Sequence, residues 1–100
     1  MFDFKVKTLD KVVEVELKGR LDATVAPNLF KEMEKLQGRE IEQIIFRVKE
    51  LDYIASAGLR VIIFSKQKLG QNAEVIMDGA NEMVRSVIEL TGCENFVTLI

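Results

Sequence analysis

The sequence has no histidine and no tryptophan, and only one cysteine and one proline among its 100 residues. Without imidazole, the chain cannot form a Ser/His or Cys/His nucleophile pair or a histidine-ligated metal site. The lone Cys93 can form neither an internal disulfide nor a cysteine-based metal cluster. One unpaired cysteine fits a reducing cytoplasm. We therefore expect neither a metal nor a cofactor.

An excess of one charge and a long apolar run are also missing. The chain carries 14 basic and 16 acidic side chains, interspersed, for a formal net charge of −2, whereas nucleic acid and anionic lipid both require a basic face. No apolar run approaches the ~18 residues of a membrane span. Residues 1–7 alternate apolar and charged side chains, unlike a signal peptide. We predict a cytoplasmic protein that binds neither nucleic acid nor membrane.

What the sequence does contain is enough apolar material for one core. Apolar residues make up 48% of the chain, and a chain of this length folds without metal or disulfide staples. It is too short for a second domain or a two-lobed substrate cleft. We expect one globular domain over residues 1–100.

The first half of the chain predicts a hairpin, a helix and a buried strand. Residues 2–7 and 13–17 alternate apolar and charged side chains, as half-buried strands do, and Gly19 is expected to end the second strand. Thr24 is a candidate N-cap for a helix with Pro27 in its first turn, and Gly38 follows the end of that helix. Residues 41–48 predict a strand covered on both faces.

The second half alternates helices and strands. A helix is predicted to start near Ser56, followed by a strand over residues 73–77. Asn81 is the candidate cap of a third helix that stops at Gly92, and residues 96–100 predict an edge strand. The order β-β-α-β-α-β-α-β predicts an α/β sandwich, a mixed sheet of four to five strands covered by helices.

Catalytic motifs are absent from the sequence. There is no GxxxxGK, GxGxxG or HExxH pattern, and the six isolated glycines are interpreted as turns and helix ends. Cys93 follows a predicted helix end, where the helix dipole disfavours a thiolate, so we interpret it as a small apolar residue.

Ser56 is the one hydroxyl in an unusual setting. Ala55, Ala57 and Gly58 surround it with little bulk where a strand-like run turns into a helix. A helix N-terminus tolerates a phosphate, because its free N–H groups and dipole favour negative charge. Ser56 is therefore a candidate phosphate acceptor; as the alternative it simply caps the helix, which would contribute about 1 kcal/mol.

The helix after Ser56 is apolar around most of its first three turns. Val61 and Phe64 add to the stripe formed by Leu59, Ile62 and Ile63, and one sheet cannot cover all of these side chains. Either a neighbouring helix packs against them, or part of this helix is a partner-binding surface.

Several segments together resemble the bacterial anti-sigma factor antagonists of the STAS superfamily. These segments are the turn over residues 19–22, the helix start over residues 55–59, and Leu90-Thr91-Gly92 near the end. The resemblance covers nearly the whole chain and implies a STAS-like fold. Many members of the family continue into a further C-terminal helix, so we expect apolar surface near Ile100 to be left for another chain.

The resemblance implies a protein-binding switch rather than an enzyme. Members of the family bind an anti-sigma factor that is also a serine kinase, and so free a sigma factor for transcription; the kinase then phosphorylates the antagonist, and a phosphatase resets it. Carried over to this chain, Ser56 is the phosphoacceptor, and phosphate there abolishes docking. The implied partner-binding residues are Asp22, Ala23, Thr24, Ala55, Ser56, Ala57, Gly58 and Arg60.

One departure from the family keeps other functions open. The family usually has aspartate where this chain has Ala55. A STAS scaffold or regulatory module that is never phosphorylated is therefore the first alternative. A small enzyme using Ser56 or Cys93, and a nucleotide-binding domain, are weaker alternatives, because no base and no phosphate loop accompany them.

Overall fold

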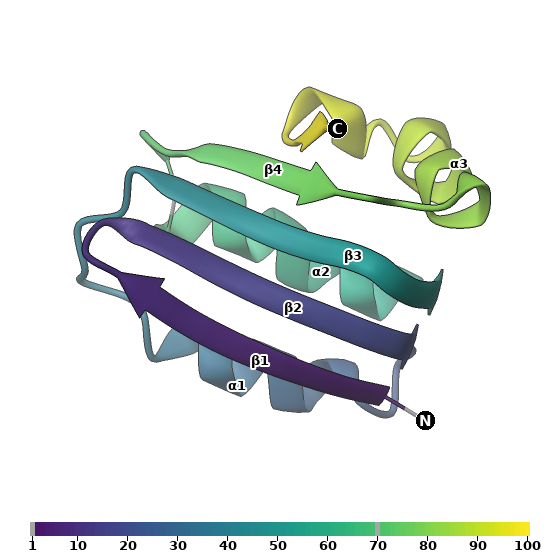
Figure 1. Cartoon of the computed structure of the whole chain (residues 1–100), viewed down its shortest axis with the longest axis horizontal. Helices are drawn as coiled ribbons and strands as arrows, with labels where there is room; N and C mark the ends of the chain where they lie inside the picture. Colours follow the sequence, from purple (N-terminus) through teal and green to yellow (C-terminus); the bar gives the residue numbers. More distant parts are fainter. Residues whose placement is uncertain (1, 70) are drawn as a thin grey trace.

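A computed structural model describes residues 2–69 and 71–100 and shows a five-stranded mixed sheet with three helices (Figure 1). The strands lie in the order β1-β2-β3-β4-β5; β1 pairs antiparallel with β2, and the other neighbours are parallel. This confirms the predicted order of elements. The strands are β1 (Phe2–Leu9), β2 (Val12–Leu21), β3 (Gln43–Ile54), β4 (Glu74–Asp78) and β5 (Thr98–Leu99). The helices are α1 (Ala26–Glu34), α2 (Ser56–Phe64) and α3 (Glu82–Leu90).

The core lies on one face of the sheet. In Figure 1, α1 and α2 lie behind the sheet and α3 lies beyond the end of β4. Alternate strand residues such as Val15, Phe46 and Met77 are fully buried against this helical layer. The periodicity of the strands places these side chains on the same face.

The opposite face of the sheet is polar, so the expectation that residues 41–48 are covered on both faces is wrong. Arg47 of β3 is exposed, and its guanidinium pairs with Glu14 at 2.7 Å and Asp78 at 3.0 Å. The hydrogen bond to Glu14 is the main cause that raises the pKa of Arg47 above its ordinary value. Three consecutive apolar residues, 44–46, suggested a strand buried on both faces. Ile45, whose side chain points to the polar face, is however only half-buried.

The prediction that Gly19 ends the second strand is also wrong, because β2 continues to Leu21. Gly19 has φ +90° and lies between two register shifts in the β2–β3 pairing. Each shift leaves one extra residue in β3, as in a β-bulge. Glycine adopts this backbone conformation without strain. The bulges change the spacing of the buried β3 residues from two to three after Val48.

The remaining boundaries differ from the predictions by a few residues. Asn81 caps α3, since its Oδ1 accepts a hydrogen bond from Val84 N at 2.8 Å, as expected. The predicted strand over residues 96–100 is reduced to β5, because Phe96 N and Val97 N donate to Cys93 O and belong to the preceding turn. A π-helical turn, Ser65–Leu69, extends α2. The expectations for Met1 and Gly70 lie outside the described residues.

Candidate functional site

Two strand-to-helix turns lie side by side at one edge of the sheet. The parallel strands β2 and β3 end together, since Leu21 is paired with Ile54. A backbone hydrogen bond of 2.9 Å from Ala55 N to Leu21 O ties the second turn to the end of the first strand. The residues predicted to bind a partner come from these two turns and the start of α2, so the fold brings them onto neighbouring segments.

Asp22 organises the first turn. Its Oδ1 accepts hydrogen bonds from Thr24 N at 3.0 Å and Val25 N at 3.3 Å, an Asx turn that satisfies donors ahead of the helix. Pro27 lies in the first turn of α1, as predicted, but Thr24 is not the N-cap. The residue at the cap position is Val25, without a side-chain cap bond, so Asp22 orders the turn ahead of α1 but does not cap the helix.

Ser56 is exposed and is the first residue of α2. The residue at the N-cap position is Ala55, with extended backbone and no side-chain cap hydrogen bond, so the alternative that Ser56 caps the helix is wrong. The backbone N–H groups of the first helical turn have no partner inside the helix. The Ser56 hydroxyl therefore lies next to free donors and the positive end of the helix dipole.

Close packing fixes the position of this helix start. A side-chain carbon on Gly58 would lie 2.7 Å from Leu21 Cγ and 3.0 Å from Ile54 Cγ1. Leu59, the next residue, is 4% exposed and anchors α2 in the core. Gly58 thus permits the close approach that holds Ser56 at the sheet edge, whereas Ala57 is half-buried and Arg60 exposed.

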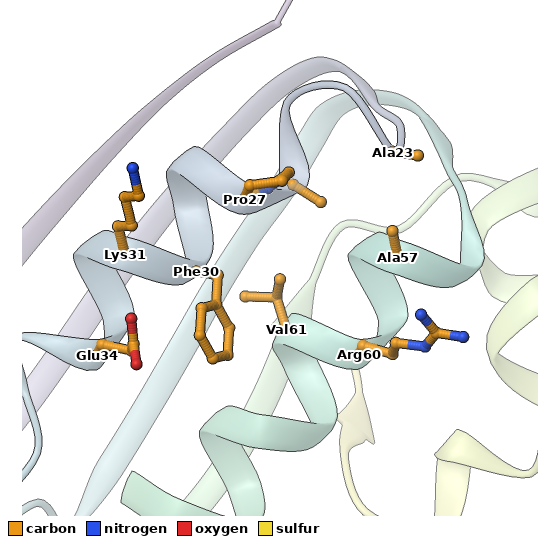
Figure 2. Close-up of a pocket in the computed structure, with 9 residues that line it drawn as sticks. Ala23, Pro27, Phe30, Lys31, Glu34, Ala57, Arg60 and Val61 are labelled. Carbon is orange, nitrogen blue, oxygen red and sulfur yellow. The ribbon is translucent and has the colours of Figure 1, made fainter.

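A shallow groove of about 390 Å³ runs between α1 and α2 beside this turn (Figure 2). Of the predicted partner-binding residues, Ala23, Ala57 and Arg60 line the groove; Thr24 and Ser56 do not. Sequence reasoning missed the contribution of α1. Its lining residues are Ala26, Pro27, Phe30, Lys31 and Glu34, with Val61 added from α2.

The groove answers the question raised by the apolar character of α2. The rings of Phe30 and Phe64 pack across the two helices with centroids 4.6 Å apart, so a neighbouring helix covers part of α2. The rest of the space between the helices is the open groove, which small side chains such as Ala26 and Ala57 line. One feature of the sequence could have indicated that α1 lines the groove. Phe30 is apolar and directly follows the core residue Leu29, so it lies on a different side of the helix from the core.

Other candidate chemistry is not supported within residues 2–69 and 71–100. Cys93 is 3% exposed, which confirms its interpretation as a small apolar residue. No group of three or more His, Cys, Asp or Glu side chains in these ranges is arranged to hold a metal ion. None of the helices in the same ranges is long and apolar enough to cross a membrane.

The fold matches solved structures of anti-sigma factor antagonists. One from Mycobacterium paratuberculosis superposes with a TM-score of 0.85 at 21% identity, covering 99% of this chain and 85% of that chain. Unphosphorylated SpoIIAA gives a TM-score of 0.83 at 18% identity over 98% of this chain and 88% of its own. The phosphorylated form of Bacillus SpoIIAA gives a TM-score of 0.76 at 18% identity and covers 98% of this chain and 91% of that chain. The class of fold is therefore that of SpoIIAA.

The chain belongs to the STAS domain family, whose model matches residues 3–100. Among curated proteins, the anti-sigma-B factor antagonist of Staphylococcus aureus strain NCTC 8325 is 24% identical over 96 residues. The match covers 95% of this chain and 89% of that protein. The similarity to anti-sigma factor antagonists thus extends through sequence as well as fold.

Proposed function

We propose that this protein is an anti-sigma factor antagonist, a single STAS domain over residues 1–100 that acts in the bacterial cytoplasm by binding and not by catalysis. The family membership and the antagonists among its relatives support this function. Its partner is an anti-sigma factor with serine kinase activity, and docking frees a sigma factor for transcription. The exposed Ser56 hydroxyl at the start of α2, where the turns after β2 and β3 adjoin, is the observation that carries the proposal.

The proposed switch is electrostatic. In the unphosphorylated state the docking face consists of Asp22, Ala23, Thr24, Ala55, Ser56, Ala57, Gly58 and Arg60. A phosphate on Ser56 adds a charge of about −1.5 to −2 at neutral pH. That charge enters a surface from which binding would exclude water, and a loss of about 3 kcal/mol weakens binding roughly a hundredfold. A phosphatase then restores the free hydroxyl.

Calorimetry with the purified anti-sigma factor of the source organism tests docking. We expect Ser56→Ala to bind like the wild type and Ser56→Asp to bind at least about tenfold more weakly, because the carboxylate carries part of the phosphate's charge. The matched control is Ser86→Asp, the same change at an exposed serine of α3. Equal affinities for wild type and Ser56→Asp would contradict the switch.

Phosphorylation itself needs a separate experiment, because Ala55 stands where the family usually has aspartate. Incubation with the anti-sigma factor and ATP is expected to add about 80 daltons, the mass of one phosphoryl group, to the wild type and nothing to Ser56→Ala. Binding without this mass increase would favour the second candidate function, a STAS regulatory module that is never phosphorylated. Ala55 is the residue that favours this second candidate.

A further inference from the structure

The open groove beside Ser56 has an apolar floor and few charges. Five lining residues, Ala23, Ala26, Pro27, Ala57 and Val61, are small or apolar side chains of the two helices and the turn ahead of α1. The ring of Phe30 also lines the groove and stands beside Val61, as Figure 2 shows. Ala23 and Ala57 also belong to the proposed docking face, so this groove is continuous with that face.

The charges at the rim distinguish the two sides of the groove. Lys31 and Glu34 line it from α1, and Arg60 is the charged residue that lines it from α2. Arg60 is exposed and extends away from Phe30 (Figure 2). Within residues 2–69 and 71–100, the ion pairs include Lys35 with Glu32 but none with Arg60. The α2 side of the groove therefore offers one cation that an incoming carboxylate can pair with.

We propose that the groove between α1 and α2 anchors one apolar side chain of the anti-sigma factor, and that Arg60 pairs with a carboxylate adjacent to that side chain. This inference rests on the proposed function, because it specifies how the same partner would bind. The apolar lining accounts for the anchor, since burial of an apolar side chain is the usual source of affinity at the centre of an interface. The guanidinium of Arg60, which has no ion-pair partner in the described residues, accounts for the carboxylate that we expect next to the partner's apolar side chain.

The position of Arg60 also links the groove to phosphorylation. Arg60 follows Ser56 by four residues on α2, and side chains at this spacing lie next to each other on one helix face. A phosphate on Ser56 therefore competes with the partner's carboxylate for the same guanidinium. In this scheme, phosphorylation weakens docking in two ways: it adds charge to the face, and it withdraws the cation that the partner requires.

The anchor is tested by filling the groove with a larger side chain and measuring, by calorimetry, the affinity for the same anti-sigma factor. Ala23 is exposed in the turn before α1, so Ala23→Leu fills the groove without disturbing the core. We expect it to weaken binding about tenfold or more, and Arg60→Gln to weaken binding about fivefold. The control Asn28→Leu introduces the same leucine side chain at an exposed α1 residue outside the groove and is expected to bind within about twofold of the wild type.

The outcomes separate this inference from the proposed function. If Ser56→Asp binds weakly while Ala23→Leu and Asn28→Leu both bind as tightly as the wild type, the anchor is overturned and the switch stands. If Ala23→Leu binds weakly while Ser56→Asp binds like the wild type, the anchor stands and the switch is overturned. A wild-type protein that does not bind the anti-sigma factor overturns both.

The competition for Arg60 can be measured without any partner. Phosphoserine incorporated at position 56 during synthesis can be titrated by ³¹P NMR in the wild type and in Arg60→Gln. Pairing with Arg60 is expected to lower the second pKa of the phosphate by roughly 0.2–0.4 relative to Arg60→Gln. Arg60→Lys retains part of this difference, and Lys31→Gln serves as the control. Equal pKa values in the wild type and Arg60→Gln overturn the competition.

Discussion

At the scale of single residues, the candidate site depends on how little space its side chains occupy. Ala23 and Ala57 keep the groove open, and Gly58 lets α2 approach Leu21 and Ile54. The polar groups at this site are the side chains of Lys31, Glu34 and Arg60, which line the groove, and the exposed hydroxyl of Ser56 beside it. Such a site is suited to recognition by another protein, whose side chains would supply the missing bulk.

Gly58→Ala tests this requirement for space. In an open helix the change would stabilise the protein by up to about 1 kcal/mol through helix propensity. Here the added carbon meets Leu21 Cγ at 2.7 Å, and Leu21 is fully buried. Overpacking of this kind costs about 1–3 kcal/mol, so we expect a net loss of about 1 kcal/mol in the free energy of unfolding.

Urea unfolding measures this loss, with Ser56→Ala as the comparison. Ser56→Ala also places alanine in the first turn of α2, but at an exposed position. It is expected to change the free energy of unfolding by less than about 0.5 kcal/mol. A Gly58→Ala protein as stable as the wild type would mean that Leu21 and Ile54 can move aside.

At the scale of elements, single side chains attach helices to strands. Asn81 caps α3 through Val84 N and also donates from Nδ2 to Leu51 O at 3.1 Å, at the bulged part of β3. One side chain thus determines where α3 begins and joins it to the strand that leads into the candidate site. The pairing of β3 with β4 ends at Arg47 and Asp78, so Leu51 lies beyond that ladder, and its carbonyl oxygen accepts the bond from Asn81.

Asn81→Ala is expected to lower the free energy of unfolding by about 1–2 kcal/mol, because it removes both the cap and the bond to β3. Asn81→Asp keeps the cap acceptor and loses the donor, so its loss should be about half as large. Urea unfolding of the two variants separates the contributions. Equal losses would show that the bond to Leu51 O, and not the cap, carries the effect.

At the scale of the whole molecule, the sheet has one buried and one charged face. Lys18 on the charged face lies 3.2 Å from Glu50 and 3.5 Å from Glu16. The hydrogen bond to Glu50, followed by the charges of both carboxylates, raises the pKa of Lys18 above its ordinary value. A raised lysine pKa contributes stability below about pH 10.5, and that contribution is lost as the pH rises through the higher folded-state pKa.

Stability is therefore expected to be nearly independent of pH between 6 and 8. No histidine is present, and histidine is the side chain whose ordinary pKa falls in this window. The melting temperature, measured by calorimetry in one mixed buffer, should change by less than about 2 °C from pH 6 to 8. Loss of the Lys18 contribution should appear only above pH 10.5, and a change of about 5 °C near neutrality would contradict this account.

Much of the fold could be predicted because hydrophobic periodicity is a local property. The order of strands and helices and the cap at Asn81 followed from the spacing of apolar and capping residues. The extension of β2 past Gly19 could not be predicted, because glycine occurs both at strand ends and at bulges within strands. The solvated face of β3 was missed for a similar reason, since adjacent isoleucines do not reveal which face neighbouring strands leave open.

The sequence by itself determined the elements, the family resemblance and the accessible Ser56, because small residues around a hydroxyl at a helix start are a local pattern. Only the tertiary structure decided that α1 contributes Pro27 and Phe30 to the groove beside α2. The reason is physical: a groove consists of surfaces from two helices, and the parallel pairing of β2 with β3 sets their distance and alignment. Neither helix carries that information in its own sequence.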